Sequence, residues 1–361
     1  MSAFRFAARH SINNVLQKAS YTMDRPFCHP TQIILRITDR CNFRCVMCGV
    51  WKSPGKRQDE LRTDELKSIL LDFKSWLKRS FYVQFTGGEV FLRKDMLDII
   101  RFASSNGIKT LVNSNGSLID KEMAKKIADS GLDYLTISFD SVDPEIFDGI
   151  RGKGAYKQTI SGILHANAHK REGMIVGVSA IIMDRNMDQM APLVRWVEEK
   201  GLDRVGFHAL NKSGKALSSG PSLNQSLVSD AEELDATIDS LIHLKTMGSP
   251  IINSVNSLKR MKNYYRNPFA PRRGSKCMAG FNNLFVLPDG DVKLCNRMDS
   301  IGNIRRLPTS EIWRSQEANV IRKGIKNCEE VCLNKCLYGM SLLEKARLFF
   351  FLMRKGQYKE T

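Results

Sequence analysis

Three cysteines near residue 45 are spaced as metal ligands often are. Cys41, Cys45 and Cys48 follow the spacing C-x3-C-x2-C, which lets their thiolates converge on one loop. Thiolates are soft ligands that select zinc or iron–sulfur centres. A structural zinc site normally needs a fourth ligand, which Cys28 or His29 could supply. The spacing alone therefore leaves two interpretations open, a short zinc knuckle and an iron–sulfur cluster.

A second cysteine group lies near the end of the chain. Cys277 and Cys295 flank a hairpin signal with Pro-Asp-Gly at 288–290, so a hairpin can bring the two thiols together. The other members of the group are spaced by four and can converge from one helical face or from a turn. They are Cys328, Cys332 and Cys336. In a reducing compartment such grouping favours metal ligation or redox chemistry over disulfides.

The segment from about residue 31 to 210 contains the elements that must position the first group. Short β-branched apolar runs alternate there with longer stretches of helical spacing, which is typical of β-α units around a parallel sheet. Six strands are predicted, at residues 33–37, 82–86, 110–113, 134–139, 175–182 and 204–208, with helices at 63–77, 95–105, 120–130, 156–169 and 187–200. The expected fold is α/β, a partial barrel of six β-α units, in which chemistry gathers at the carboxyl ends of the strands.

Composition and charge limit the class of protein. The chain has 361 residues, 42% of them apolar, and a formal net charge of +17. No stretch approaches the roughly 20 apolar residues that span a bilayer, and the N-terminus lacks the pattern of a secretory signal, so the expected location is cytoplasmic. The charge attracts an acidic substrate, nucleic acid or a membrane surface. Nucleic acid is the unfavoured partner, because the basic residues form no stripe with aromatic ones.

Both ends of the chain combine apolar and basic residues. Residues 4–18 mix Phe and aliphatic side chains with three Lys and Arg side chains, which predicts a basic amphipathic arm. The apolar run at 348–353 is flanked by Arg347 and Arg354. Two interpretations remain open, peripheral contact with a membrane surface and packing against the barrel.

The first cysteine group, directly after the first predicted strand, resembles the signature of the radical S-adenosylmethionine (SAM) superfamily. The sequence Gly-Val-Trp-Lys at 49–52 also resembles the residues after the motif in many members. The resemblance implies that Cys41, Cys45 and Cys48 hold a [4Fe-4S] cluster whose open iron chelates SAM. Met47 occupies the position where the superfamily carries a large residue that packs near adenine. Members reduce SAM to methionine and a 5′-deoxyadenosyl radical, which abstracts hydrogen from a substrate.

Gly87, Gly88 and Glu89 close the second predicted strand. The glycines allow close approach of the backbone, and the carboxylate can accept a hydrogen bond from a cationic amine. These residues resemble the Gly-Gly-Glu motif of the superfamily, which implies that they bind the amino group of SAM. An ordinary tight turn is the alternative.

Further candidates stand near the ends of the later strands. Asn113 begins a turn that resembles the superfamily's Thr-Asn-Gly turn, and Ser138 could reach the ribose or methionyl group of SAM. Arg151 matches a segment common in members with an auxiliary cluster, which implies pairing with the carboxylate of SAM. Ser179 and His208 are candidate catalytic residues that point toward the predicted site. A packed or hydrogen-bonded structural histidine is the alternative for His208.

The second cysteine group resembles the SPASM domain or the shorter twitch domain. The resemblance implies one auxiliary [4Fe-4S] cluster held by Cys277, Cys295 and two of the last three cysteines, with zinc as the alternative. A full SPASM domain carries more cysteines, so a second auxiliary cluster is not expected. The predicted regions are an amphipathic arm at 1–30, the barrel at 31–212, a bridging segment at 213–270 with a helix near 230–247, the auxiliary-cluster domain at 271–337 and a C-terminal helix at 338–361.

Together these features predict a radical SAM enzyme that uses SAM, a SAM-binding [4Fe-4S] cluster and an auxiliary [4Fe-4S] cluster. The leading hypothesis is oxidative modification of a small molecule, such as a sugar-like or anionic metabolite or a lipid head group. Maturation of a peptide or protein by crosslinking or epimerisation is the second hypothesis, and a non-enzymatic zinc or iron–sulfur protein is the third. The expected partner is an electron donor of the reduced flavodoxin or ferredoxin type.

Overall fold

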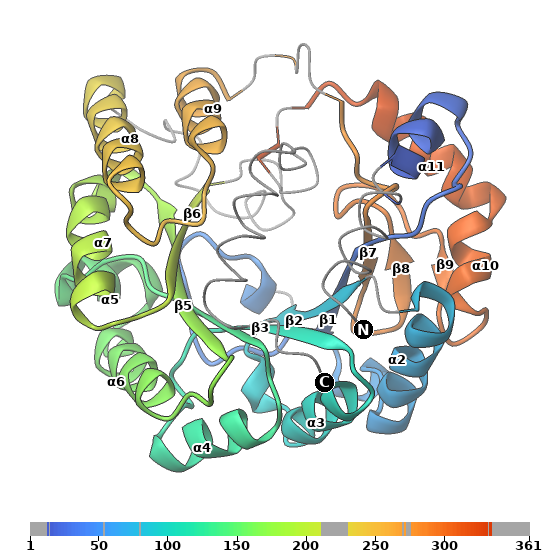
Figure 1. Cartoon of the computed structure of the whole chain (residues 1–361), viewed down its shortest axis with the longest axis horizontal. Coiled ribbons are helices and arrows are strands. Elements are labelled where there is room, and N and C mark those ends of the chain that lie inside the picture. The colour runs from blue at the N-terminus through green and yellow to red at the C-terminus, as the bar shows by residue number, and fades with distance from the viewer. Residues whose placement is uncertain are drawn as a thin grey trace.

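The computed structural model describes residues 13, 15–52, 55–78, 81–210, 230–268, 271, 276–330 and 332–333. Within these residues one continuous sheet curves around the interior of the molecule, and helices cover its outer side (Figure 1). Six parallel strands make the barrel part, β1 (Gln32–Thr38), β2 (Tyr82–Gly87), β3 (Lys109–Ser114), β4 (Tyr134–Ser138), β5 (Ile175–Ile182) and β6 (Arg204–Ala209). The six predicted strands are confirmed to within one residue at each end.

The helices between these strands pack against the outer face of the sheet. Those that the sequence predicts are α2 (Thr63–Leu77), α3 (Met96–Ser105), α4 (Lys121–Asp129), α6 (Ala155–Ala168) and α7 (Met190–Glu199). In β1 the alternate residues Ile33, Leu35 and Ile37 are at most 1% exposed and belong to the core under the helices. The residues between them are less buried and line the concave side of the sheet. The partial α/β barrel is therefore confirmed.

The sequence analysis did not predict four of the α-helices in the described residues, although two of them are 12 residues long and bury residues at helical spacing. They are α5 (Pro144–Arg151), α9 (Val255–Arg266), α10 (Thr309–Arg314) and α11 (Gln316–Asn327), whereas α8 (Ala231–Thr246) agrees with the helix expected near 230–247. In α5 the start signal is local, because Asp143 accepts a hydrogen bond from the amide of Glu145 over 2.8 Å and Pro144 occupies the first turn. Helix α7 begins three residues later than predicted, since residues 184–189 form a 3-10 segment.

The sheet does not end with the barrel strands. Its order is β6-β5-β4-β3-β2-β1-β7-β8-β9, where β7 (Asn283–Val286) runs parallel to β1, and β8 (Asp291–Lys293) and β9 (Gly302–Asn303) are antiparallel additions. The predicted hairpin is confirmed by the pairing of β7 with β8. It extends the barrel sheet, so the strands near the second cysteine group share a sheet with the strand that precedes the first. The boundaries of the five predicted regions remain predictions.

The two ends of the chain are described only in part. Residues 15–23 are helical, and the ring of Tyr21 lies 5.6 Å from that of Phe281, while Lys326 Nζ donates to the carbonyl oxygen of Tyr21 over 2.9 Å. This part of the predicted arm packs against the protein. Residues 1–12 and the predicted C-terminal helix lie outside the described residues. Among the described helices, none has the length and apolar character needed to cross a membrane.

Candidate functional site

The loop after β1 carries the first cysteine group. Cys45 is buried, whereas Cys41 and Cys48 are half-buried. Trp51 Nε1 and the amide of Cys48 each donate to the carbonyl oxygen of Cys45 over 3.1 Å. The amide of Val46 donates over 2.9 Å to a carbonyl oxygen in the last turn of α5. Hydrogen bonds within the protein therefore define the shape of this loop.

The three thiols lie close enough to influence one another. Burial raises the pKa of Cys45; the guanidinium of Arg151 opposes this rise, while the thiols of Cys48 and Cys41 add to it. Burial also raises the pKa of Cys41, with a smaller contribution from Cys48. Nη1 of Arg151 lies 3.8 Å from Sγ of Cys45. A cation beside a thiol favours the thiolate, which is the form that binds metals.

Arg151 is held in place by a buried carboxylate. Its Nε donates to Oδ2 of Asp140 over 2.6 Å, and the Asp140 side chain is fully buried. The other oxygen of Asp140 accepts from the amide of Ile181 over 2.8 Å, which joins the pair to β5. The structure therefore brings Arg151 to the first cysteine group, fixed between β5 and the cysteine loop.

Glu89 lies between the ends of β2 and β3. Its Oε1 accepts from the amide of Phe91 over 3.1 Å and from the hydroxyl of Ser114 over 2.9 Å, and its Oε2 accepts from the amide of Asn115 over 2.7 Å. The side chain is fully buried, and this burial raises its pKa, while the three donors lower it in part. The carboxylate of Glu89 thus ties the end of β2 to the turn after β3.

Gly87 and Gly88 let the end of β2 pass directly against the cysteine loop. The amide of Gly88 donates to the carbonyl oxygen of Thr38, and the amide of Glu89 donates to that of Arg40, each over 2.8 Å. A Cβ on Gly87 or Gly88 would lie 2.1 Å from the oxygen of Thr38 or Arg40, respectively. The φ of Gly87 is 145°, which also favours glycine. The two glycines are therefore required by the packing of these two segments.

Asn115 is a site residue that the sequence-based prediction missed. Its Nδ2 lies 4.0 Å from Sγ of Cys41 and donates to Oδ1 of Asn42 over 2.9 Å. The amide of Phe43 also approaches Sγ of Cys41, at 3.5 Å. Such N–H groups favour the thiolate over the thiol. The signal was present in the turn at 113–116, whose Asn-Gly pair contains Asn115.

The remaining candidates lie in the cysteine loop or on the barrel strands. Met47 is buried in the loop, at 8% exposure. Asn113 is half-buried on β3, and Ser138 and Ser179 are half-buried partners in the register of β4 and β5. His208 is exposed on β6. The structure therefore brings Ser138 and Ser179 together and distributes the other candidates over neighbouring strands of the same sheet.

Three members of the second cysteine group also lie close together. Burial raises the pKa of Cys295, and the thiols of Cys332 and Cys277 raise it further. Cys277 is buried, and the other two are half-buried. Cys328 is half-buried at the end of α11, and Cys336 lies outside the described residues. The structure thus groups Cys277 and Cys295 with Cys332.

The donors around the first group fit an iron–sulfur cluster. In the parts of the chain that the structure describes, no three His, Cys, Asp or Glu side chains are grouped to hold a single metal ion. The thiolate ligands of a [4Fe-4S] cluster bind different irons and do not need to meet at one point. Three thiols on one loop, with the guanidinium of Arg151 and the amides of Phe43 and Asn115 directed at two of them, supply a suitable set.

Comparison with known proteins agrees with this geometry. The pattern of the radical SAM superfamily matches residues 35–197, and that of an iron–sulfur cluster-binding domain, SPASM, matches residues 277–337. An Fe-coproporphyrin III synthase of Methanosarcina barkeri is 28% identical over 316 residues, covering 82% of this chain and 76% of the relative. A PqqA peptide cyclase of Rhodopseudomonas palustris is 26% identical, covering 84% of this chain and 78% of the relative.

A solved structure shows the same fold. Streptococcus suis SuiB bound to the precursor peptide SuiA matches with a TM-score of 0.66 and 15% sequence identity, covering 91% of this chain and 79% of that protein. The chain belongs to the radical SAM superfamily and carries a SPASM domain. It is an enzyme whose cofactors are SAM, a SAM-binding [4Fe-4S] cluster and an auxiliary iron–sulfur cluster.

Proposed function

We propose that Cys41, Cys45 and Cys48 bind the SAM-binding cluster and that the enzyme cleaves SAM reductively to methionine and a 5′-deoxyadenosyl radical. The cluster, when bound, supplies the open iron and the electron for this cleavage. The observation that carries the proposal is that three thiols lie on the loop after β1, with Nη1 of the buried Arg151 3.8 Å from Sγ of Cys45.

In this proposal different residues around the cysteine loop bind different groups of SAM. Arg151 uses Nε for Asp140 and directs Nη1 at Cys45, which leaves donors on Nη2 for the carboxylate of SAM. Both oxygens of Glu89 accept from protein donors, so its part is to orient the turn at Gly88, whose main chain meets the amino group. Met47 packs near adenine.

Two strand residues complete the proposed SAM site. Asn113 and Ser138 are half-buried near the carboxyl ends of β3 and β4, where polar side chains can bind the ribose or methionyl part of SAM. Ser179 and His208, on β5 and β6, face the substrate in this proposal. A reduced flavodoxin or ferredoxin supplies the electron.

For the auxiliary cluster we assign Cys277, Cys295 and Cys332 as ligands. The thiols of Cys332 and Cys277 both add to the rise that burial causes in the pKa of Cys295, which supports the assignment. The fourth ligand is Cys328 or Cys336. Held by these cysteines, such a cluster would supply an acceptor for one electron. A substrate that has lost one hydrogen atom to the 5′-deoxyadenosyl radical would then be oxidised by two electrons in all.

The proposed substrate is an anionic small molecule. The formal net charge of +17 supports an anion, and a relative over most of the chain is an Fe-coproporphyrin III synthase. A peptide substrate is the second candidate, because a PqqA peptide cyclase is a relative at 26% identity. The two candidates are separated by adding either a mixture of anionic small molecules or a mixture of short peptides to the enzyme. The mixture that stimulates formation of 5′-deoxyadenosine contains the substrate class.

The Cys41→Ala variant tests the assignment of the first cluster. Purified without oxygen, the wild-type protein is expected to be brown and to form 5′-deoxyadenosine from SAM and dithionite, whereas the variant is expected to form none. Cys28→Ser is the matched control, since the Cys28 thiol is buried and donates to the carbonyl oxygen of Phe281 over 3.2 Å. A colourless wild-type protein with zinc and no sulfide would falsify the proposal, as would an active Cys41→Ala variant.

A further inference from the structure

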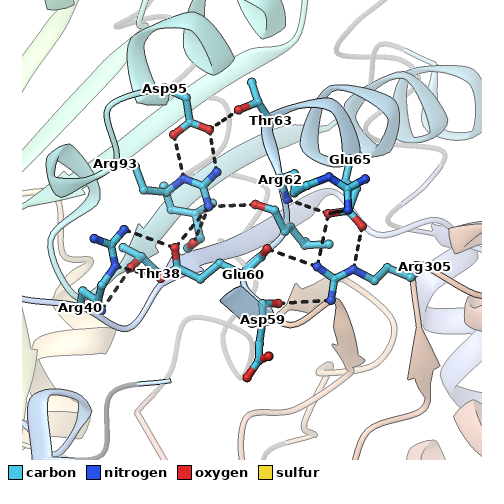
Figure 2. A network of polar contacts seen from close by, with 12 residues as sticks. Thr38, Arg40, Asp59, Glu60, Arg62, Thr63, Glu65, Arg93, Asp95 and Arg305 are labelled. Atoms are coloured by element: carbon cyan, nitrogen blue, oxygen red, sulfur yellow. Dashed lines mark hydrogen bonds and ion pairs between the residues drawn. The ribbon is translucent and has the colours of Figure 1, made fainter. Parts of the chain in front are cut away.

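Residues 59–65, here called the Glu60 segment, lie between Thr38 and Arg40 on one side and Arg305 on the other (Figure 2). The segment ends in the first turn of α2, and its Leu61 amide donates to the carbonyl oxygen of Pro288, at the tip of the β7–β8 hairpin, over 2.6 Å. It therefore contacts the hairpin whose flanks carry Cys277 and Cys295.

The Glu60 side chain holds the end of β1. Its Oε1 accepts from the hydroxyl of Thr38 over 2.5 Å and from Nε of Arg40 over 3.3 Å, and its Oε2 accepts from Nη2 of Arg40 over 3.3 Å. Glu60 is 8% exposed, and Arg93 Nη1 lies 3.7 Å from its Oε2. Moving this buried carboxylate away from its cationic and hydroxyl partners would leave a buried charge unpaired, so its position is well defined.

The residues that Glu60 holds are those on which the proposed SAM site is built. Arg40 directly precedes Cys41, and the carbonyl oxygens of Thr38 and Arg40 accept from the amides of Gly88 and Glu89. A displacement of Thr38 or Arg40 therefore moves a proposed cluster ligand and the Gly-Gly-Glu motif together.

Arg305, which follows β9 in the auxiliary-cluster domain, fastens the Glu60 segment from the other side. Its Nη2 donates to the carbonyl oxygen of Glu60 over 3.2 Å, and its Nη1 donates to the carbonyl oxygens of Asp59 and Asp289 over 3.2 and 3.0 Å. Its Nε donates to Oε1 of Glu65 over 2.7 Å. One planar guanidinium thus joins the segment, α2 and the hairpin tip. Figure 2 shows its contacts with Asp59, Glu60 and Glu65.

We infer that Arg305 and Glu60 are positioning residues through which the auxiliary-cluster domain sets the affinity of the barrel for SAM. The connection runs from Arg305 to the main chain of Glu60, through the Glu60 carboxylate to Thr38 and Arg40, and from their carbonyl oxygens to Gly88 and Glu89. Neither residue touches SAM in this inference, which rests on the proposed SAM site. Loosening Arg305 is expected to weaken SAM binding more than it slows the cleavage of bound SAM.

The test compares Arg305→Ala with Arg306→Ala, its exposed neighbour. In the cluster-loaded protein, the change that SAM causes in the electron paramagnetic resonance spectrum of the reduced SAM-binding cluster gives the Kd for SAM. Arg305→Ala is expected to raise this Kd and the KM about fivefold, at the lower end of typical couplings between sites. The expected kcat at saturating SAM stays within about twofold of wild type, since the reacting groups are unchanged. Arg306→Ala is expected to match wild type.

Hydrogen–deuterium exchange on the cluster-free protein gives an independent readout. The amides of Gly88 and Glu89 are expected to exchange faster in Arg305→Ala and in Glu60→Gln than in wild type, because their acceptors are less firmly held. If Arg305→Ala does not fold, Arg305→Lys replaces it. Lysine keeps the charge, but its three donors lie on one nitrogen and cannot serve the three carbonyl oxygens and the Glu65 carboxylate together.

Two results would overturn the inference. One is a wild-type Kd for SAM in the folded Arg305 variant, whatever the exchange rates at Gly88 and Glu89. The other is an equal change in Arg306→Ala. If instead the wild-type protein neither binds nor cleaves SAM, the proposed function fails, while the exchange measurement still decides whether Arg305 holds the cysteine loop.

Discussion

The carboxylate of Glu89 has both oxygens occupied by donors from the protein, two of them main-chain amides of Phe91 and Asn115. Replacing Glu89 by Gln puts an NH2 group, which is a donor, in place of one carboxylate oxygen. The main-chain N–H that donates to that oxygen then has no acceptor. We expect a loss of about 1–3 kcal/mol in the free energy of unfolding, the usual cost of a buried donor left without an acceptor.

Urea unfolding of the cluster-free Glu89→Gln protein measures this loss. Glu122→Gln is the control, because Glu122 is an exposed carboxylate on α4 paired with Lys125. Equal midpoints for Glu89→Gln and wild type would show that the carboxylate is not needed to hold β2 to the turn after β3.

The burial of His29 is expected to make the free energy of unfolding depend on pH. His29 lies with its ring 5.6 Å from that of Trp76, and burial lowers its pKa, with smaller contributions from the positive charges of Arg314 and Lys78. An unfolded histidine takes up a proton near pH 6.5, whereas the folded one does so only at lower pH. The unfolded state then binds more protons, so stability falls as pH decreases below about 6.5.

The His29→Phe variant removes this titration and keeps an apolar ring. We expect its unfolding midpoint in urea to fall less than that of wild type when the pH is lowered from 7.5 to 5.5. Parallel pH profiles for the two cluster-free proteins would rule out a contribution from His29.

At the scale of elements, helix α6 fixes the turn that carries Asn115. Thr159 Oγ1 donates to the carbonyl oxygen of Asn115 over 2.9 Å, and a Cβ on Gly162 would lie 2.0 Å from the carbonyl oxygen of Gly116. We expect Gly162→Ala to destabilise the protein by about 1–3 kcal/mol, because the helix must move away from the turn. Since Asn115 approaches Cys41, iron retention is expected to fall as well.

Gly149→Ala, in α5, is the matched control for a helical glycine. The nearest atom to a Cβ there is Nη1 of Arg185, at 3.8 Å. Alanine is therefore expected to leave stability unchanged or to raise it by up to about 1 kcal/mol. Thermal unfolding of both variants checks the pair, and the expectation for α6 is wrong if Gly162→Ala is as stable as Gly149→Ala.

For the whole molecule, the decisive contact is the pairing of β1 with β7, which makes one sheet from strands about 250 positions apart, as in Gln32 with Asn283. Removing residues 271–361 turns β1 into an edge strand and deprives Trp76 of Trp313, whose ring centre lies 6.0 Å away. An exposed strand edge of this kind promotes aggregation. We expect the shortened chain to be largely insoluble.

A full-length variant with Cys277→Ala and Cys295→Ala is the control, because it loses two proposed ligands of the auxiliary cluster and keeps β7. It is expected to remain soluble and to retain the SAM-binding cluster. A soluble, monomeric shortened chain, measured by sedimentation, would show that the barrel does not need β7.

Much of the fold could be predicted because its signals are local. The six barrel strands and the five helices between them follow from periodicity within windows of five to fifteen residues. Cys41, Cys45 and Cys48 lie within eight positions, so the shape of one loop brings them together. The paired domains of the superfamily follow from such local motifs.

Features that depend on contacts between distant parts of the chain could not be predicted from local patterns. Neither periodicity nor a motif pairs Arg305 with Glu65, 240 positions away, or makes the β7–β8 hairpin an extension of the barrel sheet. The hydrogen-bond donors to the two oxygens of Glu89 also come from two segments, since the amides of Phe91 and Asn115 follow different strands. The metal-binding chemistry of the thiols follows from the sequence alone, since residue type and spacing are local. Only the fold decided which buried carboxylates and guanidinium groups hold them, because such groups find partners by proximity in space.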